Sequence, residues 1–153
     1  MVSRLFLVVV VGLLVLSASM RVRNEKISPV NHELTQEECS ACHFAFQAAM
    51  LHSASWTRLM NSLESHFGED ASLDEDSGAE ITNYLNSGSA DSSWIGNRFS
   101  RGQTNDWPIR ITETDHWLRE HENQSFKTKD FEDIYRSDCV ACHDNAADGD
   151  FRE

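Results

Sequence analysis

The chain has 153 residues and a formal net charge of −12 at pH 7, and this length suits one domain or two very small ones. A surface with 25 Asp and Glu against 13 Lys and Arg repels nucleic acid and anionic membranes, so neither is expected as a partner. The charge favours a basic protein partner, although solubility alone explains it equally well.

The first 19 residues are typical of an export signal. Arg4 gives a positive start, residues 5–16 form an apolar run, and residues 17–19 have the small-x-small pattern of a cleavage site. The run is shorter than the about 20 residues that a spanning helix needs, so cleavage after Ser19 is favoured over an uncleaved anchor. Export implies a compartment in which cysteines form disulfides unless another group captures them.

An arm and a first helix are expected next. The arm, residues 20–33, shows no clear periodicity. The sequence TQEE at residues 35–38 is a capping box, so a helix is predicted to begin there. This helix would carry the stretch CSACH at residues 39–43.

The second predicted helix has one apolar face. The residues on this face, at helical spacing, are Trp56, Leu59, Met60, Leu63 and Phe67. His66 shares the face, and Gly68 follows as a stop. A second capping box, SLDE at residues 72–75, predicts a third helix that ends near Gly88.

A polar linker is predicted to divide the chain. Residues 87–106 are rich in Ser, Gly and Asn, which is typical of a linker or loop. We place the linker at residues 91–106, between an N-terminal part at residues 20–90 and a C-terminal part at residues 107–153.

The C-terminal part predicts a short helix capped by Thr114 or Asp115, in which Trp117 and His121 share a face. Three further residues at helical spacing precede the stretch CVACH at residues 139–143; they are Phe131, Ile134 and Tyr135. No convincing strand pattern is found, so the predicted fold class is all-α.

All four cysteines lie in two copies of one pattern, C-x-x-C-H. A disulfide or thiol redox pair needs no histidine, and zinc needs thiolates maintained in an oxidising compartment. Covalent haem attachment uses every residue, because two thiols form thioethers with the vinyl groups and the histidine binds the iron. Two covalently bound haem c groups are therefore predicted. Haem 1 would use Cys39, Cys42 and His43, and haem 2 would use Cys139, Cys142 and His143.

The sixth ligand of each iron decides its chemistry. The candidates are His32, His52, His66, His116, His121, Met50 and Met60. Periodicity favours His66 and His121, which lie on helix faces that would point to a buried iron. Met60 shares the face of His66 and is the main rival, although Met commonly just fills a core. Two bis-histidine irons would have lower potentials than His/Met irons and would be closed to small ligands.

Four stretches together resemble the dihaem cytochrome c family. In chain order they are CSACHFAF, SWTRLMNSLESHFGEDASLD, RITETDHWLREH and CVACHDNAADGDF. The likeness covers about residues 38–151. It implies an N-terminal part like a class I cytochrome c, a less regular helical C-terminal part, and bis-histidine ligation of both irons.

The resemblance also implies which histidines serve as distal ligands. His66 matches the distal ligand of haem 1 and His121 that of haem 2, although the sequence alone leaves a crossed arrangement open. The family has a Pro-Trp-Phe stretch where this chain has DHWL at residues 115–118, so His116 becomes a local competitor of His121.

The function implied by the resemblance is that of a periplasmic electron carrier and not an enzyme. A membrane cytochrome b would be the donor, and a monohaem c-type cytochrome with a basic docking face the acceptor, with no small-molecule substrate. The alternative is a haem enzyme or ligand sensor with one open iron, which requires a displaceable ligand. The alternative location is periplasmic but anchored by an uncleaved N-terminal segment.

Overall fold

The computed structural model describes residues 26–92, 97–103, 107–121 and 135–152. The predicted export signal lies outside these residues, as do Phe131 and Ile134. In the described part the secondary structure is helical, without a strand, which confirms the predicted all-α class. None of its helices is long and apolar enough to cross a membrane.

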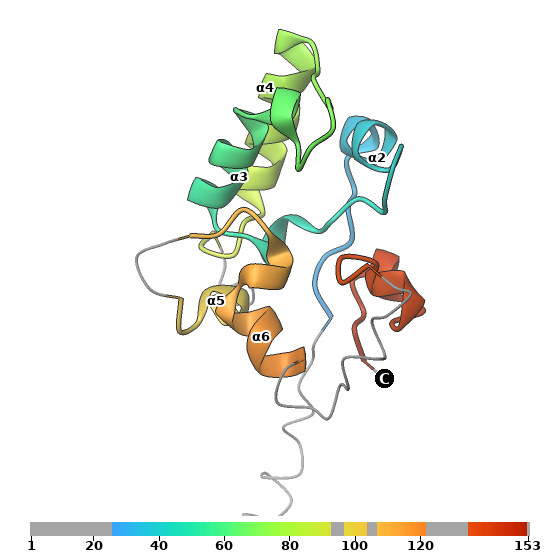
Figure 1. Ribbon diagram of the computed structural model, residues 1–153, viewed down its shortest axis with the longest axis vertical. Coiled ribbons are helices and arrows are strands. Elements are labelled where there is room, and N and C mark those ends of the chain that lie inside the picture. Colours follow the sequence, from blue (N-terminus) through green and yellow to red (C-terminus); the bar gives the residue numbers. More distant parts are fainter. Residues whose placement is uncertain (1–25, 93–96, 104–106, 122–134, 153) are drawn as a thin grey trace, which may run out of the picture.

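The α-helices are short, and 3₁₀ turns lie between several of them. The α-helices are α2 (Glu33–Cys39), α3 (Ser53–Met60), α4 (Glu75–Ser87), α5 (Asn97–Ser100) and α6 (Asp115–His121). The 3₁₀ turns are η1 (Ala48–Met50), η2 (Leu63–Ser65), η3 (Ile111–Glu113), η5 (Cys139–Ala141) and η6 (Ala146–Asp148). Helices α3 and α4 pack against each other, as do α5 and α6 (Figure 1).

Helix α2 begins and ends earlier than the capping box predicts. Its N-cap is His32, whose Nδ1 accepts a hydrogen bond from the Thr35 backbone amide at 3.3 Å. Thr35 is itself buried inside the helix. Because α2 ends at Cys39, the rest of the first C-x-x-C-H motif lies in the turn that follows, and the prediction of a helix carrying the whole motif is wrong.

Helix α3 stops well before the end of the predicted apolar face. It ends at Met60, where the Asn61 amide closes the last turn onto the Thr57 carbonyl. The turn η2 follows, and the chain then reverses, with the Glu69 amide donating to the His66 carbonyl at 3.1 Å. Gly68 lies in this reversal with φ +110°, so the glycine marks a tight turn and not the end of a long helix.

The N-cap of helix α4 lies two residues after the start of the predicted capping box. Asp74 is the N-cap, and its carboxylate accepts a hydrogen bond from the Ser77 amide at 3.0 Å. Ser72 instead donates its hydroxyl to Asp70 at 2.6 Å, within a local turn. The predicted end is confirmed, since Gly88 is the C-cap.

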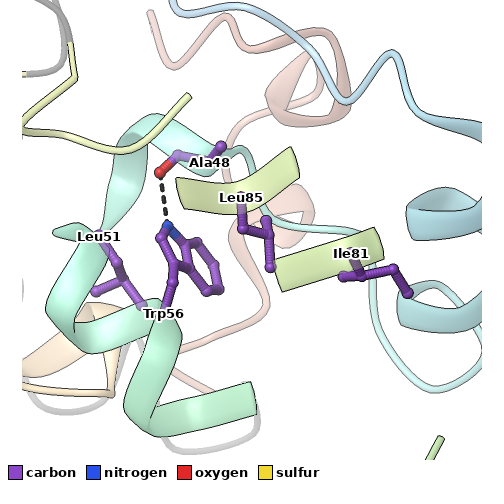
Figure 2. Packing of buried hydrophobic residues seen from close by; sticks show 5 residues of the cluster. All are labelled: Ala48, Leu51, Trp56, Ile81 and Leu85. Carbon is purple, nitrogen blue, oxygen red and sulfur yellow. Dashed lines mark hydrogen bonds between the residues drawn. The ribbon is translucent and has the colours of Figure 1, made fainter. Parts of the chain in front are cut away.

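The hydrophobic core lies between α3, α4 and η1 (Figure 2). Its buried members are Ala48, Leu51, Trp56, Ile81 and Leu85. The Trp56 indole donates to the Ala48 carbonyl at 2.7 Å, which pairs the indole N–H inside the apolar cluster. The core therefore packs α3 and α4 against η1, the turn that follows the first motif.

The two parts of the chain are packed together. The Gln47 side-chain amide donates to the carbonyls of Ala146 and Ala147 at 2.7 and 3.2 Å. The N-terminal arm also runs beside the C-terminal segment, where the Ile27 amide donates to the Gly149 carbonyl at 2.8 Å (Figure 1). The predicted linker contains α5, which contacts both α6 and η1.

Candidate functional sites

The four cysteines are free thiols in the structure. All four lie in the described part of the chain and none is bonded to another. Within that part no three His, Cys, Asp or Glu side chains gather to hold a metal ion. Burial and, secondarily, Glu38 raise the pKa of Cys39, while burial and Asp138 raise the pKa of Cys139 to about 11. Redox-active cysteines have lowered pKa values, so these thiols do not fit that alternative.

At the first motif, His43 faces His66. Their ring centres are 6.2 Å apart and the ring planes differ by 28°. His43 Nδ1 lies 2.9 Å from the Phe44 carbonyl oxygen, which only accepts, so Nδ1 carries the proton. The lone pair of His43 is then on Nε2, the nitrogen available to a metal.

The distance between these rings fits one metal ion with an imidazole on each side. Two metal–nitrogen bonds of about 2 Å each, with about 1 Å more from each nitrogen to its ring centre, place the ring centres about 6 Å apart. The residues of the first site therefore fit a six-coordinate haem iron, with Cys39 and Cys42 close by in sequence.

His66 is held by an unusual turn. It follows η2 directly and precedes Phe67, a non-glycine residue with φ +54°, a conformation that is uncommon for side chains of this size. The guanidinium carbon of Arg110 lies 3.9 Å from the centre of the Phe67 ring. Burial, then the charges of His43 and Arg110, lower the pKa of His66, which favours the neutral imidazole that binds metals.

At the second motif, His143 faces His121. Their ring centres are also 6.2 Å apart, but the ring planes differ by 89°. His121 Nδ1 lies 2.8 Å from the Trp117 carbonyl oxygen, which only accepts, so Nδ1 carries the proton. The His121 ring stacks on the Trp117 indole with ring centres 4.2 Å apart. His143 Nδ1 is buried and has no hydrogen-bond partner among the described residues.

Helix α6 positions His121. The Thr114 hydroxyl accepts from the Trp117 amide at 3.2 Å, so the predicted Thr114 cap is present. A cavity beside α6 is lined by both thiols of the second motif and by both His121 and His143. These residues therefore fit a second haem, and the buried Met50 of the N-terminal part lines the same cavity.

His116 and Met60 lie differently from the facing pairs. His116 also lines the second cavity, but its ring packs on Phe99 at 4.3 Å. Burial is the main cause that lowers the pKa of His116 to about 4, so this side chain stays neutral. Met60 packs against the hydrophobic core.

Two other histidines have structural partners for both ring nitrogens. His32 caps α2 through Nδ1, and its Nε2 lies 3.2 Å from Glu80. His52 caps α3 through Nδ1, with Nε2 3.3 Å from Asp91 and its ring stacked on Trp107 at 3.8 Å. Neither has a nitrogen left for iron.

The structure adds one residue that the sequence reasoning missed. Arg110 comes from the C-terminal part and reaches the His66 turn of the N-terminal part. The sequence does carry a signal for it, since Arg58 is the only Lys or Arg between Lys26 and Arg98. Within residues 27–97 the chain therefore supplies one cation, Arg58.

Comparison with known proteins gives one family. A family model described as dihaem cytochrome c matches residues 35–151. A structure of a dihaem cytochrome c from Rhodobacter sphaeroides is 45% identical, covers 80% of this chain and 98% of its own, and has a TM-score of 0.75. A crystal structure of DHC purified from the same organism is 43% identical, with coverages of 79% and 97% and a TM-score of 0.68.

A third solved structure is more distant. It is a dihaem cytochrome type c from Shewanella baltica OS155, 28% identical, covering 78% of this chain and 86% of its own, with a TM-score of 0.63. No protein with a curated description matches the chain.

Proposed function

Because the chain belongs to the dihaem cytochrome c family, we propose that it is a periplasmic electron carrier whose two haem irons each lie between two histidines. The family assignment makes the chain an electron-transfer haem protein with two haem c groups, attached at the two C-x-x-C-H motifs. The proposed axial ligands are His43 and His66 for haem 1, and His143 and His121 for haem 2.

The observation that carries this proposal is the repeated spacing of the histidine pairs. Each motif histidine faces one further histidine, and both pairs have ring centres 6.2 Å apart. Bound haem supplies the Fe(III)/Fe(II) couple, and two histidines leave the iron without a position for a substrate. A carrier of single electrons needs no such position.

The chain's own residues would hold these ligands in fixed orientations. The carbonyls of Phe44 and Trp117 each accept from the Nδ1 of one ligand, His43 or His121, which fixes the tautomer and the ring plane. Side chains that do not reorient between oxidation states suit rapid electron transfer.

The expected partners follow from charge. Residues 27–97 contain eleven Asp and Glu and one Arg, and Glu69 and Asp70 are exposed immediately after the His66 turn. Such a surface accelerates association with a basic protein and permits rapid release. The proposed acceptor is a monohaem c-type cytochrome with a basic docking face, and the proposed donor is a membrane cytochrome b. The apolar run at residues 5–16 supports export to the periplasm.

Carbon monoxide tests the proposed ligation. The reduced wild-type protein should keep its low-spin spectrum under carbon monoxide, because both irons are already six-coordinate. His66→Ala and His121→Ala should each create one carbon monoxide site, whereas the matched variant His52→Ala should create none. Carbon monoxide binding by the wild-type protein would contradict the proposal and favour the haem enzyme or sensor alternative.

A further inference from the structure

Arg110 brings a positive charge to the acidic part of the molecule. Its guanidinium carbon lies 3.9 Å above the Phe67 ring, directly after the proposed ligand His66. In residues 27–97 the eleven acidic residues are opposed by Arg58 alone, so Arg110 is an added cation for this region.

We propose that Arg110 raises the reduction potential of haem 1. The proposal rests on His43 and His66 being the ligands of that haem. Oxidation adds one positive charge at the iron, so a nearby cation disfavours the oxidised form and a nearby anion favours it. The surrounding carboxylates lower the potential, and Arg110 opposes them.

The position of the Arg110 charge is fixed by the fold. Its backbone precedes η3, where its carbonyl accepts from the Glu113 amide at 3.0 Å. The next residue, Ile111, packs against the hydrophobic core. The flat guanidinium lies over the face of the Phe67 ring, a favourable cation–π arrangement. Both ends of the side chain are thus held.

Two features reduce the expected effect. The Arg110 side chain is 47% exposed, so water and salt screen its charge. Glu113 Oε1 also lies 3.5 Å from Arg110 Nε and cancels part of the field. Removing the Glu113 charge should therefore shift the reduction potential of haem 1 in the direction opposite to removal of the Arg110 charge.

The experiment is a potentiometric titration of the full holoprotein, with wild type compared with Arg110→Gln. The variant should change the equilibrium constant for reduction of haem 1 about threefold to fivefold toward the oxidised form, as is typical for a half-exposed charge. This corresponds to a downward shift of about 30–40 mV at 59 mV per tenfold for one electron. Arg110→Lys keeps the charge and should shift the potential less.

The two haems can be followed separately during the titration. Electron paramagnetic resonance of low-spin Fe(III) distinguishes nearly parallel from perpendicular imidazole planes, and the two proposed ligand pairs differ by 28° and 89°. The signal of the nearly parallel pair should follow the shifted potential. The other signal should move less.

Two controls separate charge from structure. Glu113→Gln should raise the potential of haem 1, because it removes an anion beside Arg110. Arg101→Gln removes an equal charge at an exposed position after α5 and should leave haem 1 unchanged. Haem content and far-ultraviolet circular dichroism check that each variant has folded.

The outcomes distinguish this proposal from the ligation on which it rests. Unchanged potentials in Arg110→Gln, or a downward shift in Glu113→Gln, would overturn the role of Arg110 while leaving the ligands intact. A wild-type spectrum without two bis-histidine signals would overturn the ligand assignment itself, whatever the variants do.

Discussion

The hydrogen bonds of individual histidines separate structural from ligand roles. His32 and His52 each accept a helix-capping amide on Nδ1 and place Nε2 beside a carboxylate. His43 and His121 instead place Nδ1 opposite a backbone carbonyl, so that Nδ1 carries the proton. The helix face favoured His121 from the sequence, but the hydrogen-bond partner of each ring nitrogen comes from the fold.

Gly149 is the residue at which a single methyl group should be least tolerated. Its φ is +74°, and a Cβ there would lie 2.0 Å from the Ile27 carbonyl oxygen. Gly149→Ala should lower the free energy of unfolding by about 1–3 kcal/mol from backbone strain alone. Chemical denaturation of the holoprotein measures this cost.

Gly78→Ala is the matched control for that substitution. Gly78 lies in α4, and a Cβ there meets nothing within 4 Å. This variant should be stabilised by up to about 1 kcal/mol through helix propensity. If both alanine variants had equal stability, the close contact between Ile27 and Gly149 would be wrong.

At the scale of elements, the sequence predicted where helices occur better than where they end. Helices were expected over the regions of α2, α3, α4 and α6, and each is present. The apolar face through Phe67 suggested one long helix, but α3 ends at Met60, and Phe67 is 41% exposed in a turn. Periodicity does not detect such a break, because a 3₁₀ turn keeps its residues near the same register.

The N-cap of α4 should make stability depend on pH. Hydrogen bonds from Ser77 lower the pKa of the exposed Asp74. A carboxyl whose pKa is lower in the folded state stabilises the fold above its unfolded pKa, and this contribution disappears as the pH falls through the folded pKa. Asp74→Asn should therefore flatten the acid side of the stability curve, measured by thermal unfolding between about pH 5 and pH 2.

Ser72→Ala tests the alternative cap that the sequence suggested. The Ser72 hydroxyl bonds only within a local turn, to Asp70. The substitution should leave the unfolding midpoint at pH 7 nearly unchanged, whereas Asp74→Ala should lower it. The reverse order would place the cap of α4 at Ser72.

At the scale of the whole molecule, buried contacts join the two haem-binding parts. Gln47 is fully buried and donates to two carbonyls about a hundred residues away in sequence. Gln47→Ala should cost about 1–3 kcal/mol of unfolding free energy, because the buried carbonyls lose their donor. Gln36→Ala removes a similar bond to Val30 at an exposed position and should cost at most about 0.5 kcal/mol. An equal loss of unfolding free energy in the two variants would contradict a buried contact between the two parts of the chain.

The net charge of −12 should control the rate of electron transfer to a basic partner. The bimolecular rate constant with a basic monohaem cytochrome c should fall about tenfold or more between low and physiological ionic strength, because salt screens the attraction. Stopped-flow absorbance measures this rate. An acidic cytochrome serves as the control and should show a weak dependence of opposite sign, and a rate with the basic partner that is independent of salt would contradict an acidic docking surface.

The sequence by itself determined the two haem c groups, the all-α class and the family, because covalent attachment needs a fixed local spacing and helices need a local period. Only the tertiary structure decided which histidines face each other and where Arg110 lies. His43 and His66 are 23 residues apart in sequence, and Arg110 is farther still. Such positions depend on how the core packs α3, α4 and α6, and no local pattern encodes that packing.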